Sequence, residues 1–244
     1  MSRDATATLT PLHLAQRVRE PEVMDDPALD AGEHIHALEG LARLNRWSAS
    51  ARILWAPLAG LARELGAPVR VLDLATGAGD LPVHLWRRAQ RAHLSLTVDG
   101  CDRSPRSVAH AQTRADRAHA GLHFFPLDAL QDPLPIGYDV IMCSLFTHHL
   151  DSAQVVELFR RMRSAARRLV LVSDLARSAA GWWLAYLGSR LLTRSSVVHR
   201  DALLSVRAAY QPQEIRALAA DAGLQGARVQ RRWPYRWLLT WRNA

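Results

Sequence analysis

Two adjacent histidines, His148 and His149, follow an apolar run in the segment "YDVIMCSLFTHHL". Imidazole titrates near neutral pH, so this pair suits proton transfer with a bound molecule, and its nitrogens also bind metals. A third interpretation is that the rings only pack at a strand–helix junction. Adjacent residues of an extended segment point in opposite directions, so we expect at most one ring to face a substrate. No Cys or acidic residue at suitable spacing supplies further ligands, so we predict no metal site.

A second candidate is the glycine-rich turn in "VLDLATGAGDLPVHL". Glycines at 77 and 79 follow a short apolar strand, Asp80 is expected to be the N-cap of a helix, and Pro82 lies in its first turn. Glycine lets a ligand approach the backbone where a side chain would block it. The carboxyl end of such a strand is the usual ligand crevice of an open α/β sheet.

The residues around this turn limit which ligand it can bind. A dinucleotide fingerprint needs a third glycine before the helix, and neither register provides one. A phosphate-binding loop needs lysine, which the chain lacks altogether. Asp73 and Asp80 would repel phosphate at the helix N-terminus. They suit a ligand that carries positive charge, such as a sulfonium with an α-ammonium group.

At these residues the chain resembles the class I S-adenosylmethionine-dependent methyltransferases. The turn resembles their first motif, with Ala75 in place of its first glycine; "GCDRSP", "LDA" and "YDVIMCSLFTHHL" resemble the next three, so the likeness covers Val69 to Leu150. It implies that Asp102 binds the ribose diol and Asp128 the adenine; the alternative for Asp73, Asp102 and Asp128 is capping or turn chemistry. The implied cofactor is S-adenosylmethionine, held by Asp73, Ala75, Thr76, Gly77, Gly79, Asp80, Asp102, Arg103, Asp128, Ala129, Cys143 and Ser144.

The elements that position these residues alternate between strand and helix patterns, which indicates a largely parallel sheet with helices on both faces. Helices are predicted over 81–92, 105–119, 152–165 and 178–193, followed by a loop and by another helix from Pro212. The pattern is also helical from Pro11 to about Leu65, with a break at "REPEVMDDPALDAGEH". A closing antiparallel hairpin is predicted to present an aromatic and apolar stripe of Trp233, Tyr235, Trp237, Leu239 and Trp241 on one face.

The family resemblance implies a Rossmann-like α/β fold of seven strands in the order 3-2-1-4-5-7-6. We predict a tail and helical lid over 1–66 and a methyltransferase core over 67–244, with a cap insertion at about 176–210. Asp151 is predicted to be a helix N-cap.

The acceptor is less clearly indicated. The flanking segments resemble those of the ubiquinone/menaquinone C-methyltransferase group, but the likeness weakens in the cap. We therefore expect O-methylation of a small aromatic acceptor (phenolic, polyketide-like or quinol-like), with His148 and His149 as catalytic candidates. Trp182, Trp183, Tyr186, His199 and Tyr210 are the predicted acceptor contacts, and each also suits plain packing. The alternatives are C-methylation of a quinol, methylation of a nucleic acid, and a donor-binding protein without catalysis.

The amino-acid composition limits which classes of protein, partner and cellular location we expect. The chain has 244 residues, 49% of them hydrophobic and 22% charged, which is ordinary for a soluble enzyme. Its net charge of +8 comes with arginines scattered along helices, so we expect no nucleic-acid partner. The two cysteines have no CxxC spacing and no signal peptide is recognised, which suits the cytoplasm. We expect no stable membrane insertion, and a monomer or homodimer.

Overall fold

The computed structural model describes residues 14–26, 28–47 and 49–243, and its centre is one seven-stranded sheet. The strand order is β3-β2-β1-β4-β5-β7-β6, and β7 runs antiparallel to both β5 and β6. The predicted α/β fold and strand order are therefore confirmed. The strands are β1 (Val69–Leu74), β2 (Leu96–Asp102), β3 (Phe124–Pro126), β4 (Val140–Ser144), β5 (Leu169–Leu175), β6 (Arg228–Arg232) and β7 (Arg236–Arg242).

Helices cover both faces of this sheet. Helices α2 (Ser50–Leu65) and α3 (Asp80–Arg91) pack on one face through a cluster that includes Leu54, Leu58 and Leu85. On the other face, α5 (Ser152–Ala165) and α8 (Pro212–Asp221) pack against alternate residues of the same strands. Helix α4 (Pro105–Arg117) packs beside β3, at the edge of the sheet. Burial of both faces explains why the central strands read as nearly continuous apolar runs.

Local sequence signals set several of these helix ends. The Ser104 side chain accepts the Ser107 N–H, and Pro105 takes the first position of α4. Asp151 forms a capping box with Gln154 at the start of α5, which confirms its predicted N-cap role. The N-cap of α3 is Gly79 and not Asp80, which lies one residue inside the helix. The prediction for Asp80 was wrong because the left-handed backbone of Gly79 already ends the turn.

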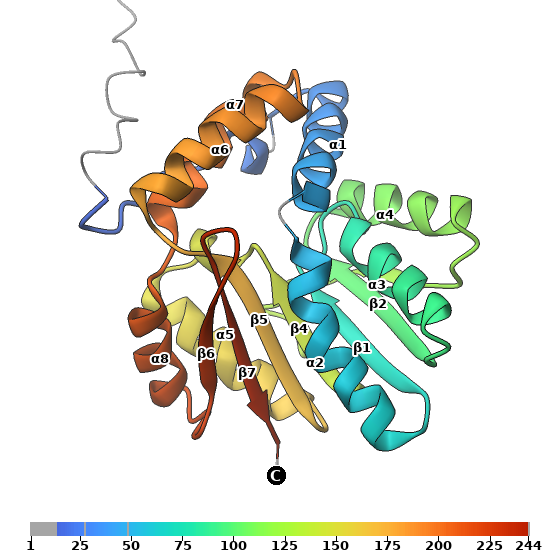
Figure 1. Ribbon diagram of the computed structural model, residues 1–244. Coiled ribbons are helices and arrows are strands. Elements are labelled where there is room, and N and C mark those ends of the chain that lie inside the picture. The colour runs from blue at the N-terminus through green and yellow to red at the C-terminus, as the bar shows by residue number, and fades with distance from the viewer. Residues whose placement is uncertain (1–13, 27, 48, 244) are drawn as a thin grey trace, which may run out of the picture.

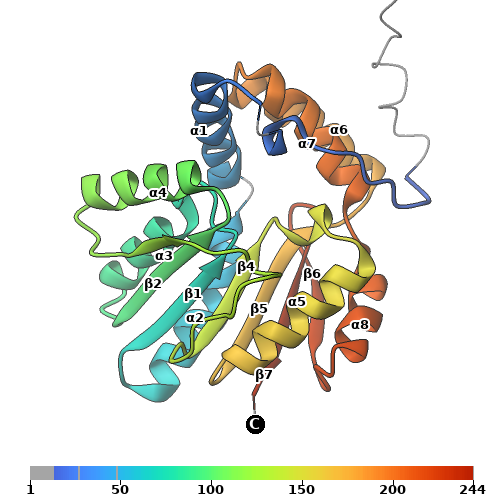
Figure 2. The same cartoon turned by 180° about the vertical axis from the view of Figure 1, so that it is seen from behind.

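A second group of helices lies over the carboxyl ends of the parallel strands. Figures 1 and 2 show α1 (Ala31–Trp47), α6 (Ala179–Leu192) and α7 (Ser196–Ala208) above this edge, with a short 3-10 turn η2 (Val23–Asp25) beside them. Helix α7 occupies a stretch that was predicted to be a loop, and that prediction was wrong. Its buried residues pack against α6, α1 and η2, so tertiary contacts support a helix whose sequence signal is weak.

Two further predictions are corrected at the ends of the chain. Residues 14–22 form no helix, although a helical pattern was predicted from Pro11; residues 1–13 lie outside the described part. In the terminal hairpin, Trp237, Leu239 and Trp241 do share one buried face. Trp233 and Tyr235 are exposed in the connecting turn, because the ladder ends at Arg232 and Arg236.

None of the helices in the described part of the chain is long and apolar enough to cross a bilayer. The division into a lid, a core and a cap insertion stays a prediction.

Candidate functional site

The turn between β1 and α3 has the backbone that its glycines predict. Gly77 and Gly79 have positive φ values of 56° and 66°. A Cβ atom on Gly79 would lie 2.7 Å from the Ala111 side chain, so that position requires glycine. Ala75, in the place of the family's first glycine, also has a positive φ of 53°, a conformation that costs an L-residue about 1–2 kcal/mol.

Asp73 lies under this turn as a buried carboxyl group. One oxygen accepts a hydrogen bond from the Thr76 hydroxyl at 2.8 Å, and the other has no partner among the described residues. Burial, together with the charges of Asp80 and Asp102, raises the pKa of Asp73 to about 8. A buried acceptor without a partner is unfavourable in the free protein and suits a ligand that brings positive charge or a donor.

The other two strand-end acids line the same side of the site. The Asp102 oxygens accept the N–H groups of Gly77 and Ser104, each at 2.9 Å, and a carboxylate retains lone pairs for further donors such as ribose hydroxyls. Asp128 accepts the Leu130 N–H at 2.8 Å, so the turn chemistry considered as its alternative role is present. The unpartnered Asp73 oxygen and the open backbone around Gly77 fit a sulfonium-bearing nucleoside donor.

The histidine pair follows β4, but it does not continue the strand. Thr147–His149 forms a 3-10 turn, and the two imidazole rings lie with centroids 4.3 Å apart. The expectation that at most one ring faces the site was therefore wrong: both line the cavity, because the turn breaks the alternation of an extended chain.

His148 is fixed by a buried carboxylate from the neighbouring strand. Its Nδ1 lies 2.7 Å from Asp174, which also accepts the Thr147 hydroxyl and the N–H groups of His148 and Leu175. Burial alone would raise the pKa of Asp174, but the His148 ring and these hydrogen bonds outweigh it and hold that pKa below its usual value. An ionised Asp174 only accepts hydrogen bonds, so Nδ1 of His148 carries a proton, and Nε2 points away from Asp174 toward Glu22.

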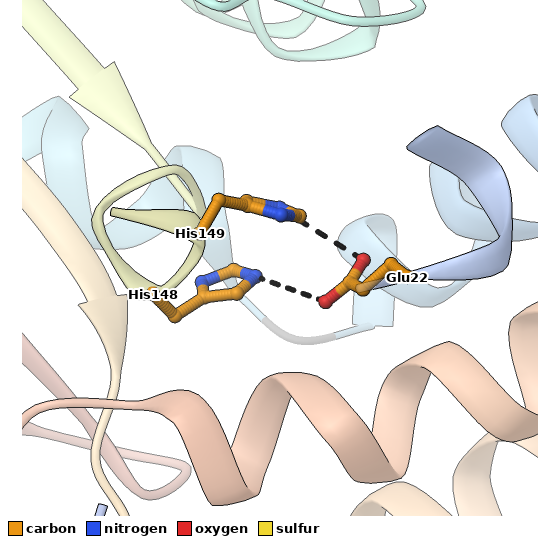
Figure 3. Close-up of side chains that lie close together, drawn as sticks. All are labelled: Glu22, His148 and His149. Carbon is orange, nitrogen blue, oxygen red and sulfur yellow. Dashed lines mark ion pairs between the residues drawn. The ribbon is translucent and has the colours of Figure 1, made fainter. Parts of the chain in front are cut away.

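Glu22 is a site residue that the sequence analysis missed. It comes from the segment before η2, and its carboxylate oxygens lie 3.7 Å from His148 Nε2 and 3.9 Å from His149 Nε2 (Figure 3). The Ser205 hydroxyl of α7 donates to Glu22 at 2.6 Å. No local pattern in "REPEVMDDPALD" marks this glutamate, because tertiary contacts alone bring it to the histidines.

One cavity of about 1170 Å³ brings the turn and the histidines together. Its lining includes Ala75, Thr76, Gly77, Asp80, Asp102, Arg103, Asp128, Ala129, Ser144, His148 and His149 among the predicted site residues. Asp73, Gly79 and Cys143 lie behind this lining: Asp73 and Cys143 are buried, and Gly79 packs against Ala111. Helices α1, α6 and α7 close the opposite side with Leu38, Leu41, Leu184, Ala185 and Val206.

The predicted acceptor contacts do not line this cavity. Trp182 is buried against Leu203 and Val206, whereas Trp183 is exposed on the outer side of α6. Tyr186 stacks on Trp182, the His199 ring pairs with the Thr193 carbonyl, and the Tyr210 hydroxyl donates to the Leu150 carbonyl. Helix α6 instead lines the cavity with Gly181, Leu184 and Ala185. A direct role for the five predicted residues stays a prediction.

Comparisons with known proteins agree with this geometry. The family model described as a methyltransferase domain matches residues 71–168. The chain is 30% identical over 169 residues to a demethylmenaquinone methyltransferase of Thermus thermophilus, which covers 64% of this chain and 74% of that protein.

Solved structures share the fold at lower identity. Magnesium protoporphyrin IX methyltransferase from Synechocystis PCC 6803, with bound S-adenosylmethionine, superposes with a TM-score of 0.57 at 18% identity, over 90% of this chain and 100% of that one. Human N-acetylserotonin methyltransferase, also with S-adenosylmethionine, gives 0.60 at 17% identity, over 90% of this chain and 60% of that one.

Proposed function

The chain belongs to the class I S-adenosylmethionine-dependent methyltransferases, and from that premise we propose that it methylates a hydroxyl oxygen of a small aromatic acceptor. One observation carries the proposal: the donor turn and the Glu22, His148 and His149 side chains line the same cavity. A methyl donor bound at the turn and a hydroxyl at the histidines would then share one enclosed space.

The donor side requires binding and alignment more than activation, since the bound sulfonium supplies an already activated methyl group. Asp102, which accepts the Gly77 N–H beside the turn, would hold the ribose diol, and the Asp73 carboxyl beneath the turn, when ionised, would provide negative charge for the cationic end. Alignment of two reactants in one site can lower the barrier by about 7–11 kcal/mol.

The acceptor side requires help with the proton. A phenol ionises near pH 10, so its hydroxyl is a poor nucleophile at neutral pH. His148 lines the cavity and, in its neutral form, would accept the phenol proton at Nε2 while Asp174 fixes its ring from behind. A base in this position contributes about 10²–10⁴-fold to the rate.

The shape of the cavity supports an aromatic acceptor. Helix α1 contributes Leu38, Leu41 and Leu44, and α6 contributes Leu184 and Ala185, which together form an apolar wall facing the strand ends. A flat ring can lie against such a wall while its hydroxyl reaches the imidazoles. The second candidate is C-methylation of a quinol, which is favoured by the demethylmenaquinone methyltransferases among the sequence relatives.

Radiolabelled S-adenosylmethionine incubated with a panel of phenols, quinols and RNA tests the proposal. We expect label in phenolic products, and mass spectrometry should locate the methyl group on oxygen. Label only on ring carbon of a quinol would favour the second candidate, and label only in RNA would contradict both.

A further inference from the structure

We propose that Glu22, His148 and His149 form a binding site for a divalent transition-metal ion of the Zn²⁺ type. This inference rests on the proposed function for its role, because the metal would activate the acceptor hydroxyl at the same wall. It replaces the expectation that no metal binds, which rested on rings pointing in opposite directions along an extended segment and on the lack of a Cys or acidic ligand at suitable spacing. The 3-10 turn brings both rings to one side, and Glu22 supplies the acidic ligand.

The geometry of the three side chains provides the first argument. One ligand atom from each residue lies within 4.8 Å of the other two, and both Nε2 atoms point toward the Glu22 carboxylate (Figure 3). Metal bonds of about 2.0–2.2 Å place neighbouring ligand atoms roughly 3.0–3.5 Å apart. His148 Nε2 lies 3.7 Å from one Glu22 oxygen and His149 Nε2 lies 3.9 Å from the other. With all three ligand atoms within 4.8 Å of one another, the side chains would have to draw together by up to roughly 1.3 Å to reach this range.

The hydrogen bonds of His148 provide the second argument. Nδ1 of His148 bonds Asp174 at 2.7 Å, so Nε2 is the ring atom that a metal could reach. Nε2 lies 3.7 Å from an oxygen of Glu22, too far for a hydrogen bond between them, and both atoms border the same gap. A metal-binding histidine typically donates its other ring N–H to a carboxylate, as His148 does.

Hydrogen bonds from neighbouring residues hold Glu22, His148 and His149 in place. Ser205 donates to Glu22, and the N–H groups of Val23 and Met24, the next two residues, donate to Asp201 of α7 at 2.9 and 3.0 Å. Arg17 and Arg19 donate to the carbonyl oxygens of His148 and His149. These guanidinium groups oppose a cation electrostatically, but the carboxylates of Glu22 and Asp174 balance the charge of a divalent ion.

Two imidazoles and one carboxylate leave coordination positions open, and the cavity provides room there for an acceptor oxygen. A metal of this type lowers the pKa of bound water from 15.7 to about 7, and a coordinated phenol, which starts near 10, would ionise readily. The metal would thus take over the activation that His148 alone would otherwise provide.

Titration of the metal-free full-length chain with CoCl₂, followed by visible absorption, and with ZnCl₂, followed by calorimetry, tests the site. We expect one ion per chain, and at least tenfold weaker binding in Glu22→Gln and in His149→Ala. Both side chains are only partly buried, so these variants should fold, which circular dichroism checks. His93→Ala, which removes an exposed imidazole outside the cavity, is the matched control and should bind like the native chain.

Absence of stoichiometric Co²⁺ and Zn²⁺ binding would overturn the proposal, as would equal affinity in the native chain and the Glu22→Gln/His149→Ala double variant. The proposed function is tested independently of the metal site. If the protein methylates phenols but binds no metal, the metal site is wrong and His148 acts as the only base. If it binds metal but methylates no phenol, the metal site stands and its proposed role in methyl transfer is wrong.

Discussion

Asp73 is a buried carboxyl group whose proposed role in donor binding would come at the expense of folding. In the unfolded chain an aspartate ionises near pH 3.9, whereas in the folded protein burial raises the pKa of Asp73 to about 8. Between these pH values the folded state binds the extra proton. Asp73 therefore destabilises the folded protein least below pH 4. The destabilisation grows steadily as the pH rises from about 4 to about 8, so the free energy of unfolding falls over this range.

Substitution Asp73→Asn should therefore stabilise the protein and weaken donor binding. We expect the variant to gain about 1–3 kcal/mol in the free energy of unfolding at pH 8, since it removes the buried negative charge that the folded state disfavours. Donor affinity should fall at least tenfold. Thermal denaturation at pH 5 and pH 8, with calorimetric titration of S-adenosylmethionine, measures both.

The control for this substitution is Glu157→Gln, which changes an exposed carboxylate outside the cavity and should leave both quantities unchanged. In the native chain, donor affinity should also rise with pH up to about 8, because a cation binds the ionised carboxylate better than the protonated one. An Asp73→Asn variant that binds the donor normally and is less stable at pH 8 would contradict this account.

At the scale of elements, the sequence predicted what local patterns determine. The parallel strands coincide with short segments rich in apolar residues, the β1–α3 turn has glycines at positive φ, and Asp151 caps α5. Each of these signals lies within a few residues of the feature it predicts. The match to the family's motifs then supplied the order of the strands.

What local patterns could not predict depends on contacts between distant segments. Glu22 reaches the histidines only because the segment before η2 is tied to α7 and to the turn after β4. Asp174 meets His148 because β4 and β5 pair in register. For α6, the prominent tryptophans suggested the binding face, but Gly181, Leu184 and Ala185 line the cavity instead.

That orientation of α6 makes a specific prediction for Ala185→Leu. The added side chain would enter the cavity from the cap and reduce the space for the acceptor ring. We expect the KM for bulky acceptors to rise about tenfold, a loss of about 1.4 kcal/mol in binding, with donor affinity unchanged. Steady-state kinetics with a small and a large phenol measure the difference.

Trp183→Ala on the outer side of the same helix is the matched comparison and should leave both KM values near those of the native enzyme. The reverse pattern, with Trp183→Ala impaired and Ala185→Leu unaffected, would place the acceptor against the aromatic side of α6 instead.

At the scale of the whole molecule, several arginines connect segments that are far apart in the sequence. Arg17 donates to carbonyls of His148, Leu150 and Ala208, and Arg177 joins Ala209 to Glu214. The buried Arg236 donates to Ser50 and Ser144, and burial lowers its pKa to about 10. Part of the positive charge behind the net charge of +8 is thus engaged in internal contacts.

Because the cavity joins the strand ends to the cap, donor binding should stabilise the whole chain. S-adenosylmethionine at 100 times its Kd adds about 2.7 kcal/mol, which for a chain of this size raises the Tm by about 5–10 °C. At the same concentration Asp102→Ala, with tenfold weaker binding, should keep only about half of this stabilisation, and Glu157→Gln all of it. Differential scanning calorimetry measures the shifts. If Asp102→Ala were stabilised as fully as the native chain, the donor would not bind at the end of β2, and the assignment of the cavity's donor side would fail.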